Sequence, residues 1–173
     1  VARPPDETLP SDYNVAPSKQ VYMVVDREAD DEVQRQLRTA KWGLVPSWAK
    51  DPKIGNRMIN ARIETAAEKP SFRRAWAKRR CLLPADGYYE WYAGEGPKQP
   101  FFIHRTDGES LAMAGLFEFW KDGEDWLVTC CVLTTSAPDE LGRIHDRMPV
   151  LVPRENWQMW LDPQHPPTID MTV

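Results

Sequence analysis

Trp126-Leu127-Val128-Thr129-Cys130-Cys131-Val132-Leu133-Thr134-Thr135 is a run of β-branched and apolar residues that contains no charge. Such residues favour extended backbone, and a run of this kind is typical of a strand that is covered on both faces. We therefore predict that it is central in a sheet. Its adjacent cysteines would point to opposite faces of that strand. Together with Cys81 they are expected as reduced core residues, not as a disulfide framework.

Further strands are expected on both sides of this run, because short apolar or aromatic segments alternate with turn residues. They are expected at residues 20–25, 33–37, 41–45, 100–105, 111–120 and 148–152, with a charged turn at 26–32. Helices are expected from Pro70, with Ser71 as a cap, and at 139–143 and 155–161. The prediction is one α+β domain over residues 1–161, built on a largely antiparallel, curved or barrel-like sheet with a few short helices. An irregular Pro-rich tail is expected at 162–173.

The composition is that of a soluble globular protein, with 42% hydrophobic and 28% charged residues among 173. No apolar run approaches the roughly 20 residues that span a bilayer, so we expect a cytoplasmic protein. The net charge of −4 argues against a surface coated in positive charge, but it leaves room for a local basic groove. The most basic part of the chain is 69–80. No residues have the spacing of zinc ligands, and neither a metal nor a cofactor is expected.

An acid stands among aromatic residues in Pro84-Ala85-Asp86-Gly87-Tyr88-Tyr89-Glu90-Trp91-Tyr92. Gly87 can take a backbone angle that other residues avoid, and the run after it favours a strand. Extended backbone puts Tyr88, Glu90 and Tyr92 on one face. A carboxylate on a ring-lined face is partly desolvated and holds a proton more readily, which suits a general acid or base. The alternative is a glutamate at a sheet surface with the rings packed beneath it.

Three other positions have side chains suited to binding a nucleic acid or moving a proton. Asn60 and Arg62 share one side of an extended segment, where an amide and a guanidinium can bind an anion, although an edge strand has the same pattern. His145 can transfer protons near neutral pH, and Arg147 follows two residues later, where it could meet a phosphate; a structural histidine is the alternative. Trp48 lies in a loop between prolines, either as a lid over the core or as an exposed stacking platform.

These segments, in this order, resemble the SRAP family, the SOS response-associated peptidases. The resemblance is carried by Ile59-Asn60-Ala61-Arg62-Ile63-Glu64-Thr65, by Asp86-Gly87-Tyr88-Tyr89-Glu90-Trp91 and by Ile144-His145-Asp146-Arg147-Met148-Pro149. Three more segments are similar to the family: Tyr13 to Pro17, Trp42 to Trp48 and Pro100 to Ile103. The resemblance implies a single-domain, β-rich SRAP fold and a sensor of abasic sites in single-stranded DNA. It also implies a covalent thiazolidine cross-link, formed by the cysteine that removal of the initiator Met exposes.

The resemblance further assigns roles to single positions. The family's active-site Asn, Glu and His match Asn60, Glu90 and His145. Its DNA-facing arginines match Arg62 and Arg147, and Trp48 lies where the family places an aromatic against a base beside the lesion. SRAP proteins begin Met-Cys-Gly-Arg, whereas this chain begins at Val1. A short upstream segment with the reactive cysteine is therefore expected in the natural protein.

Two other functions remain open from the residues. One is a non-covalent single-stranded DNA-binding domain that uses Trp48 and a basic groove. The other is a peptidase, either one that acts on other proteins or one limited to self-processing of its N-terminus. A monomer that associates with the nucleoid when it is bound to DNA is expected.

Overall fold

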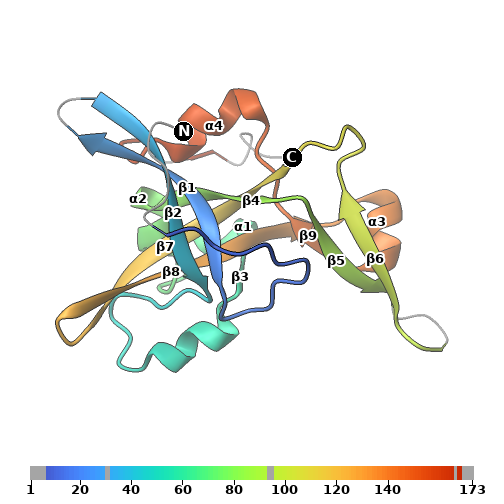
Figure 1. Cartoon of the computed structure of the whole chain (residues 1–173), viewed down its shortest axis with the longest axis horizontal. Coiled ribbons are helices and arrows are strands. Elements are labelled where there is room, and N and C mark those ends of the chain that lie inside the picture. Colours follow the sequence, from blue (N-terminus) through green and yellow to red (C-terminus); the bar gives the residue numbers. More distant parts are fainter. Residues whose placement is uncertain (1–6, 30–31, 93–95, 166, 169–173) are drawn as a thin grey trace.

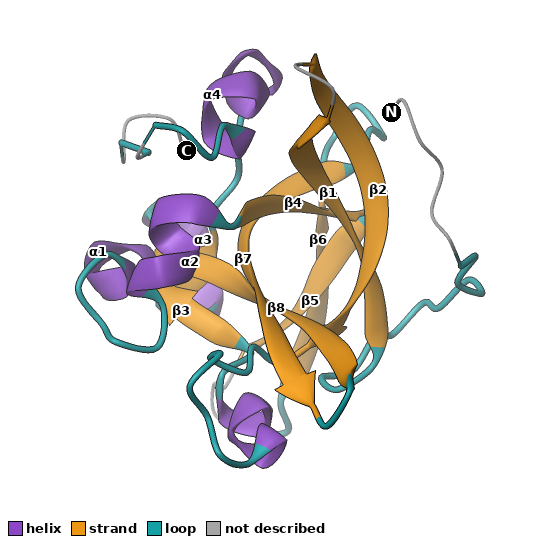
Figure 2. Cartoon of the chain, turned by 90° about the vertical axis from the view of Figure 1, so that its left-hand side faces the viewer, coloured by secondary structure: helices purple, strands orange, loops and turns teal. Residues whose placement is uncertain are grey.

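Five strands close into a barrel at the centre of the molecule (Figures 1 and 2). The computed structural model describes residues 7–29, 32–92, 96–165 and 167–168. The barrel order is β2-β1-β4-β7-β8, and β2 pairs again with β8 to close it. The strands are β1 (Gln20–Ala29), β2 (Glu32–Trp42), β4 (Arg80–Ala85), β7 (Leu111–Asp122) and β8 (Asp125–Ser136). The predicted α+β class and barrel-like sheet are thus confirmed.

The strand β8 is central, as its apolar sequence predicted. It pairs antiparallel with β7 along one edge and parallel with β2 through Lys41–Thr129 and Trp42–Cys130. Beyond the barrel it pairs parallel with β3 (Asn60–Arg62) and antiparallel with β9 (Arg147–Pro149). The C-terminal part of β8 therefore pairs with two short strands that are far apart in the sequence.

Apolar residues are buried on both faces of the barrel wall. One cluster gathers Met23, Ala40 and Cys130 with their neighbours, and the other gathers Leu116, Cys131 and the helical residues. Side chains alternate along a strand, so Cys130 and Cys131 enter different clusters, as expected. All three cysteines are free and buried.

Three helices cover the outer cluster: α1 (Ile63–Ala66), α2 (Arg73–Lys78) and α4 (Trp157–Leu161). A buried arginine, Arg80, ties α2 to the chain beyond α4. Its guanidinium donates to the carbonyls of Trp76, Ala77, Trp160, Asp162 and His165. Desolvation lowers the pKa of Arg80 to about 10. This residue of the basic segment is therefore structural, not part of a solvated face.

A second, two-stranded sheet stands apart from the barrel (Figure 1). It consists of β5 (Gly87–Tyr92) and β6 (Gln99–His104), paired antiparallel with Glu90 opposite Phe101. The helix α3 (Asp139–Ile144) contacts β5. Two short 3-10 helices, η1 (Pro52–Arg57) and η2 (Arg154–Asn156), complete the described elements.

Several predicted boundaries were wrong, because contacts distant in sequence overrode the local signals. The charged segment 26–32 is not a turn throughout, because β1 runs to Ala29. Within β1, Asp26 accepts two hydrogen bonds from Arg35 of the facing strand, at 2.8 and 2.9 Å. Residues 41–45 are not a separate strand, since β2 runs through Lys41 and ends at Trp42.

The helix expected from Pro70 begins at Arg73. The three residues before it form a turn, and Ser71 does not cap the helix. Phe72, the N-cap residue, is buried in the outer cluster, so packing fixes the helix start. The extended segment at Asn60 ends at Arg62, and Ile63 already begins α1.

Candidate functional site

The side chains of Asn60 and Arg62 are exposed on β3, while Ala61 between them is buried. Alternation along the strand explains this pattern, as the sequence predicted. Pairing with β8 sets Asn60 opposite Val132 and Arg62 opposite Thr134. Among the described residues, neither side chain has a hydrogen-bond or ion-pair partner. Both are therefore available to a ligand.

Arg147 on β9 lies beside this surface and is held by other protein groups. Its guanidinium binds both oxygens of Glu64 at 2.8 and 2.9 Å and donates to the carbonyl of Thr134 at 2.6 Å. The bidentate pair lowers the pKa of Glu64, chiefly through the hydrogen bonds from Arg147, with a smaller contribution from the charge of Arg62. The two arginines predicted to face DNA thus differ: Arg147 is hydrogen-bonded to a carboxylate, whereas the Arg62 guanidinium has no hydrogen-bond partner among the described residues.

His145 directly follows α3 and is exposed. The backbone N–H of Arg147 donates to its Nδ1 at 3.0 Å, so the neutral ring carries its proton on Nε2. A proton on Nδ1 would instead be donated to the Arg147 carbonyl at 3.1 Å, with Asp146 at 3.4 Å. The Nδ1 atom therefore has a hydrogen-bond partner both with and without a proton, which suits a group that transfers protons.

Glu90 lies on β5, two residues from Tyr88 along the same face. Burial, and then the charge of Glu90, raise the pKa of the Tyr88 phenol. Among the described residues, the Glu90 carboxylate has no hydrogen-bond partner. The strand β5 contacts α3, which leads directly into His145. The strand that carries Glu90 therefore lies against the helix that precedes His145.

The structure corrects the prediction that Gly87 adopts a backbone angle that other residues avoid. It is not among the residues with positive φ. A Cβ at this position would meet the Ile103 carbonyl oxygen and the Phe102 ring, each at 2.5 Å. Gly87 is required because the facing strand approaches its backbone closely, and the hairpin that carries Glu90 depends on this approach.

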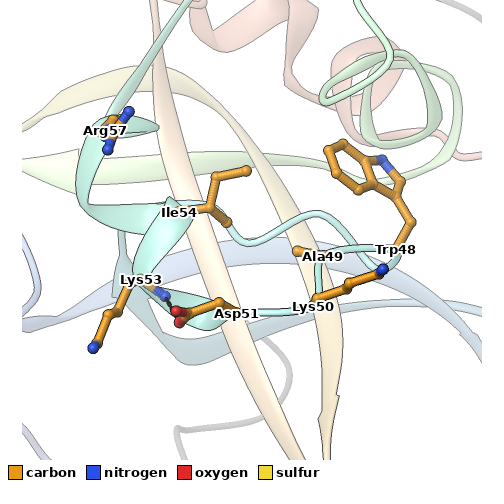
Figure 3. A pocket seen from close by; sticks show the side chains of 7 residues that line it. All are labelled: Trp48, Ala49, Lys50, Asp51, Lys53, Ile54 and Arg57. Carbon is orange, nitrogen blue, oxygen red and sulfur yellow. Dashed lines mark hydrogen bonds between the residues drawn. The ribbon is translucent and has the colours of Figure 1, made fainter.

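Trp48 is exposed, with 55% of its surface accessible, so it does not cover the core as a lid would, and its role as a stacking platform for a base stays a prediction. It lines a pocket of about 420 Å³ together with Ala49, Lys50, Asp51, Lys53, Ile54 and Arg57 (Figure 3). Its indole N–H points to the Pro70 carbonyl at 3.5 Å. The pocket is formed by the loop and η1 that precede β3.

The structure links four of the predicted site residues and leaves two apart. Register and hydrogen bonds join β3, with Asn60 and Arg62, to Arg147 and His145 around the end of β8. Glu90 is on the neighbouring hairpin, and Trp48 is on the loop before η1. That Asn60, Glu90 and His145 act on one substrate stays a prediction.

Glu64 received no role from the sequence, although it lies inside the Asn60 motif. Its ion-pair partner Arg147 lies 83 positions further along the sequence, and only the fold brings the two side chains together. Within the described ranges, no cluster of His, Cys, Asp or Glu is arranged to hold a metal ion. Nor does this part of the chain contain a helix with the length and apolarity that a membrane span requires.

Comparison with known proteins identifies the family. The model of the family described as SOS response associated peptidase (SRAP) matches residues 2–172. The chain is 43% identical over 164 residues to the Bacillus subtilis protein named Abasic site processing protein YoqW, covering 94% of this chain and 71% of the relative. It is 35% identical over 153 residues to Abasic site processing protein YedK of Escherichia coli, covering 86% and 64%.

Solved structures are also similar. A protein from Bordetella bronchiseptica superposes with a TM-score of 0.76 at 30% identity, over 98% of this chain and 88% of that one. A Bacteroides thetaiotaomicron protein gives the same TM-score at 29% identity, over 86% of this chain and 65% of that one. With a family model that matches almost its entire length, this chain belongs to the SRAP family.

Proposed function

We propose that this chain processes abasic sites in single-stranded DNA and, as a monomer, joins them covalently through an N-terminal cysteine. Family membership and the relatives named abasic site processing proteins support the substrate. The observation that carries the proposal is the exposed Asn60–Arg62 face, joined through the end of β8 to His145. Such a face offers an amide, a cation and a proton-transfer group to one phosphodiester strand.

The proposed chemistry begins with an α-amine. Its pKa of about 8 leaves a fair fraction neutral and nucleophilic at physiological pH. The amine attacks the open-chain aldehyde of the abasic sugar, and the carbinolamine loses water to give an iminium. The cysteine thiol then closes on the iminium carbon and forms the thiazolidine. The three cysteines of the chain are internal and buried, so none of them supplies this nucleophile.

The described residues are given these roles. Glu90, beside Tyr88, donates the proton with which water leaves the carbinolamine. Asn60 orients the amine by hydrogen bonding, and His145 moves a proton at the sugar oxygen to favour the open aldehyde. Arg62 binds a flanking phosphate, and Arg147, held by Glu64, adds to the positive potential there.

The same amine would support a related reaction on the abasic sugar, and the same acid would support one at the N-terminus. An iminium on the abasic sugar acidifies the neighbouring carbon, which permits lyase-type cleavage of the strand. Removal of the initiator Met by self-processing would expose the cysteine, consistent with the word peptidase in the family description. A cytoplasmic, nucleoid-associated location follows from this substrate.

A trapping experiment tests the function. The chain is compared with a chimera in which a leading segment that begins Met-Cys-Gly-Arg, the start implied by the family resemblance, is fused ahead of Val1. An oligonucleotide with one abasic site is added, and adducts are resolved under denaturing conditions. The chimera should give a denaturant-resistant band, and replacement of its cysteine by Ser should abolish the band. Absence of any adduct from the chimera would contradict the proposal.

Glu90→Gln tests the general acid within the same assay. The amide cannot donate the proton of a carboxylic acid, so adduct formation should slow by about 100-fold or more. Binding of the oligonucleotide should not weaken. The control is Glu124→Gln in the exposed β7–β8 turn, which removes the same charge and should capture at the unaltered rate. Equal rates for Glu90→Gln and the control would remove Glu90 from the mechanism.

A second function, non-covalent single-strand binding, is favoured by the exposed Trp48 and its basic pocket. It predicts a salt-sensitive gel shift without a covalent band, even from the chimera. A peptidase that acts on other proteins would cleave unrelated peptides without DNA.

A further inference from the structure

The Arg147 guanidinium is held by acceptors of the protein itself on both of its terminal nitrogens. Nη1 donates to Glu64 Oε1 at 2.8 Å and to the Ser136 hydroxyl at 3.4 Å. Nη2 donates to Glu64 Oε2 at 2.9 Å and to the Thr134 carbonyl at 2.6 Å. Only 17% of the side chain is accessible, and its Nε is buried. A phosphate would therefore have to displace the Glu64 carboxylate in order to bind both nitrogens of the fork.

The backbone of the same residue faces the imidazole of His145 with both of its polar groups. The Arg147 N–H lies 3.0 Å from Nδ1, and the Arg147 carbonyl lies 3.1 Å from the same nitrogen. The N–H satisfies a bare Nδ1, while the carbonyl, with Asp146 at 3.4 Å, satisfies a protonated one. Nδ1 is thus the anchored nitrogen in either state, and Nε2 is the nitrogen that remains for a substrate.

The other two histidines of the chain are anchored differently. Nδ1 of His104 lies 2.8 Å from the Arg105 carbonyl, and Nδ1 of His165 lies 2.7 Å from the Asp162 carboxylate. Both partners are acceptors, so these rings, when neutral, carry their proton on Nδ1. His145 differs because a backbone N–H faces its Nδ1, which puts the proton of the neutral ring on Nε2.

The backbone beside His145 has little regular structure to hold it. The helix α3 ends one residue before His145, and β9 is three residues long, with Arg147 at its start. The ends of short elements open at low free energy. The Glu64 carboxylate ties this first residue of β9 to α1. Glu64 therefore restrains the residue whose backbone anchors the imidazole.

We propose that Glu64 is a positioning residue for proton transfer: by holding the Arg147 side chain it keeps the Arg147 backbone against Nδ1 of His145, so that Nε2 faces the abasic sugar. The inference rests on the proposed function and deepens it. The protonated ring gives its Nε2 proton to the sugar oxygen, and Nδ1 keeps its own proton, which it donates to the Arg147 carbonyl. Glu64 itself touches no substrate.

The charge of Glu64 by itself predicts the opposite effect. An acid beside a DNA-binding face repels phosphates and occupies an arginine, so its removal should tighten binding and speed capture. Positioning predicts slower capture in spite of binding that is no weaker. The sign of the change in rate therefore distinguishes a positioning residue from one that only restrains Arg147.

Capture of abasic DNA by the chimera measures this sign. Glu64→Gln should lower the maximal rate of adduct formation by roughly tenfold, since misplacing a reacting group by about 1 Å costs up to about 100-fold. The DNA concentration that gives half the maximal rate should not rise. The matched control is Glu68→Gln, which removes the same charge just past α1 and should leave the rate unaltered. In Arg147→Lys, which lacks the fork that binds both carboxylate oxygens, adding Glu64→Gln should slow capture no further.

Nuclear magnetic resonance reads the His145 ring in the chain itself, without DNA. Protonated and bare ring nitrogens differ in chemical shift, and loss of one signal in His145→Gln identifies this ring. At a pH at which the rings are neutral, His145 should carry its proton on Nε2, and His104 and His165 should carry theirs on Nδ1. Glu64→Gln should give a mixture of both forms at His145 alone, and Glu68→Gln should not. Melting curves show that each variant is folded at the temperature of the measurement.

The outcomes separate this inference from the proposed function. An unaltered or increased rate in Glu64→Gln, a slowing that vanishes at saturating DNA, or a His145 ring that keeps its proton on Nε2 would each overturn the inference. A chimera with unaltered Glu64 that captures nothing overturns the proposed function instead. The spectra would then still test the link between Glu64 and His145, because they require no DNA.

Discussion

At the scale of single residues, charges near the site are distributed unequally. Arg147 and Glu64 form a bidentate pair, while the Arg62 guanidinium makes no hydrogen bond to any residue that the structure describes. The pair anchors the end of β9 to α1 and to the Thr134 carbonyl. It therefore fixes the backbone next to His145, and Arg62 is the cation that we propose binds a phosphate.

The pair makes stability depend on pH in a defined direction. Because Arg147 lowers the pKa of Glu64 below its ordinary 4.5, the stabilisation is complete above that pH and is lost as pH falls through the lower folded value. For a partly exposed pair it amounts to about 1 kcal/mol, or about 2–4 °C in melting temperature. Glu64→Gln should melt lower than the unaltered chain at pH 7, and the difference should shrink as the pH is lowered below 4.5.

The control for this titration is Glu68→Gln, an exposed glutamate just past α1. It should melt like the unaltered chain throughout. A Glu64→Gln difference in melting temperature that stays constant as the pH is lowered below 4.5 would contradict the assignment.

At the scale of elements, the hairpin of β5 and β6 places Glu90. It is separate from the barrel sheet, and rings cover much of it: Tyr89 lies 5.1 Å from Phe102, which stacks on His104 at 5.4 Å. The close approach of β6 to Gly87 sets how the hairpin leaves the barrel. Glu90 is thus positioned by a hairpin whose geometry requires glycine at position 87.

Gly87→Ala should therefore impair the site more than the fold. The added Cβ forces the strands apart, at about 1–3 kcal/mol. Capture by the chimera should slow markedly, because Glu90 moves with β5. The rate of adduct formation and the melting temperature of the variant are both measured.

Gly123→Ala provides the comparison. Its φ of +62° makes alanine cost about 1–2 kcal/mol, yet a Cβ there meets open space in the β7–β8 turn. It should lower the melting temperature similarly and leave capture unchanged. Equal slowing in both variants would mean that lost stability, not displaced Glu90, limits the rate.

At the scale of the whole molecule, one wall of strands separates two apolar clusters. Cys81 and Cys130 belong to one cluster and Cys131 to the other. Burial raises the pKa of Cys130 to about 12 and that of Cys81 well above its ordinary value. Thiols that are buried and protonated do not react as nucleophiles.

All three thiols should therefore remain unmodified by iodoacetamide in the native protein. They should become reactive at the same denaturant concentration at which far-UV circular dichroism is lost, because both clusters depend on the closed barrel. Ser11→Cys, at an exposed position, should react at once. A native thiol that reacts before the dichroism changes would indicate that one cluster opens alone.

The sequence determined the composition of the strands and the identity of the candidate groups. The run around Cys130 contains no charge and could only be covered on both faces, so its central place was predictable. Alternation likewise predicted that Asn60 and Arg62 share an exposed face. These properties are local, since they depend on the spacing of residue types along one strand.

Only the tertiary structure decided which groups are free and which are held. Arg62 and Arg147 have the same side chain, yet the Glu64 carboxylate is hydrogen-bonded to Arg147, which is 83 positions further along the sequence. Arg80 belongs by sequence to a basic surface, but carbonyls from the chain beyond α4 bury it. Register across strands and the approach of distant backbones set these pairings, and neither is encoded in any short segment.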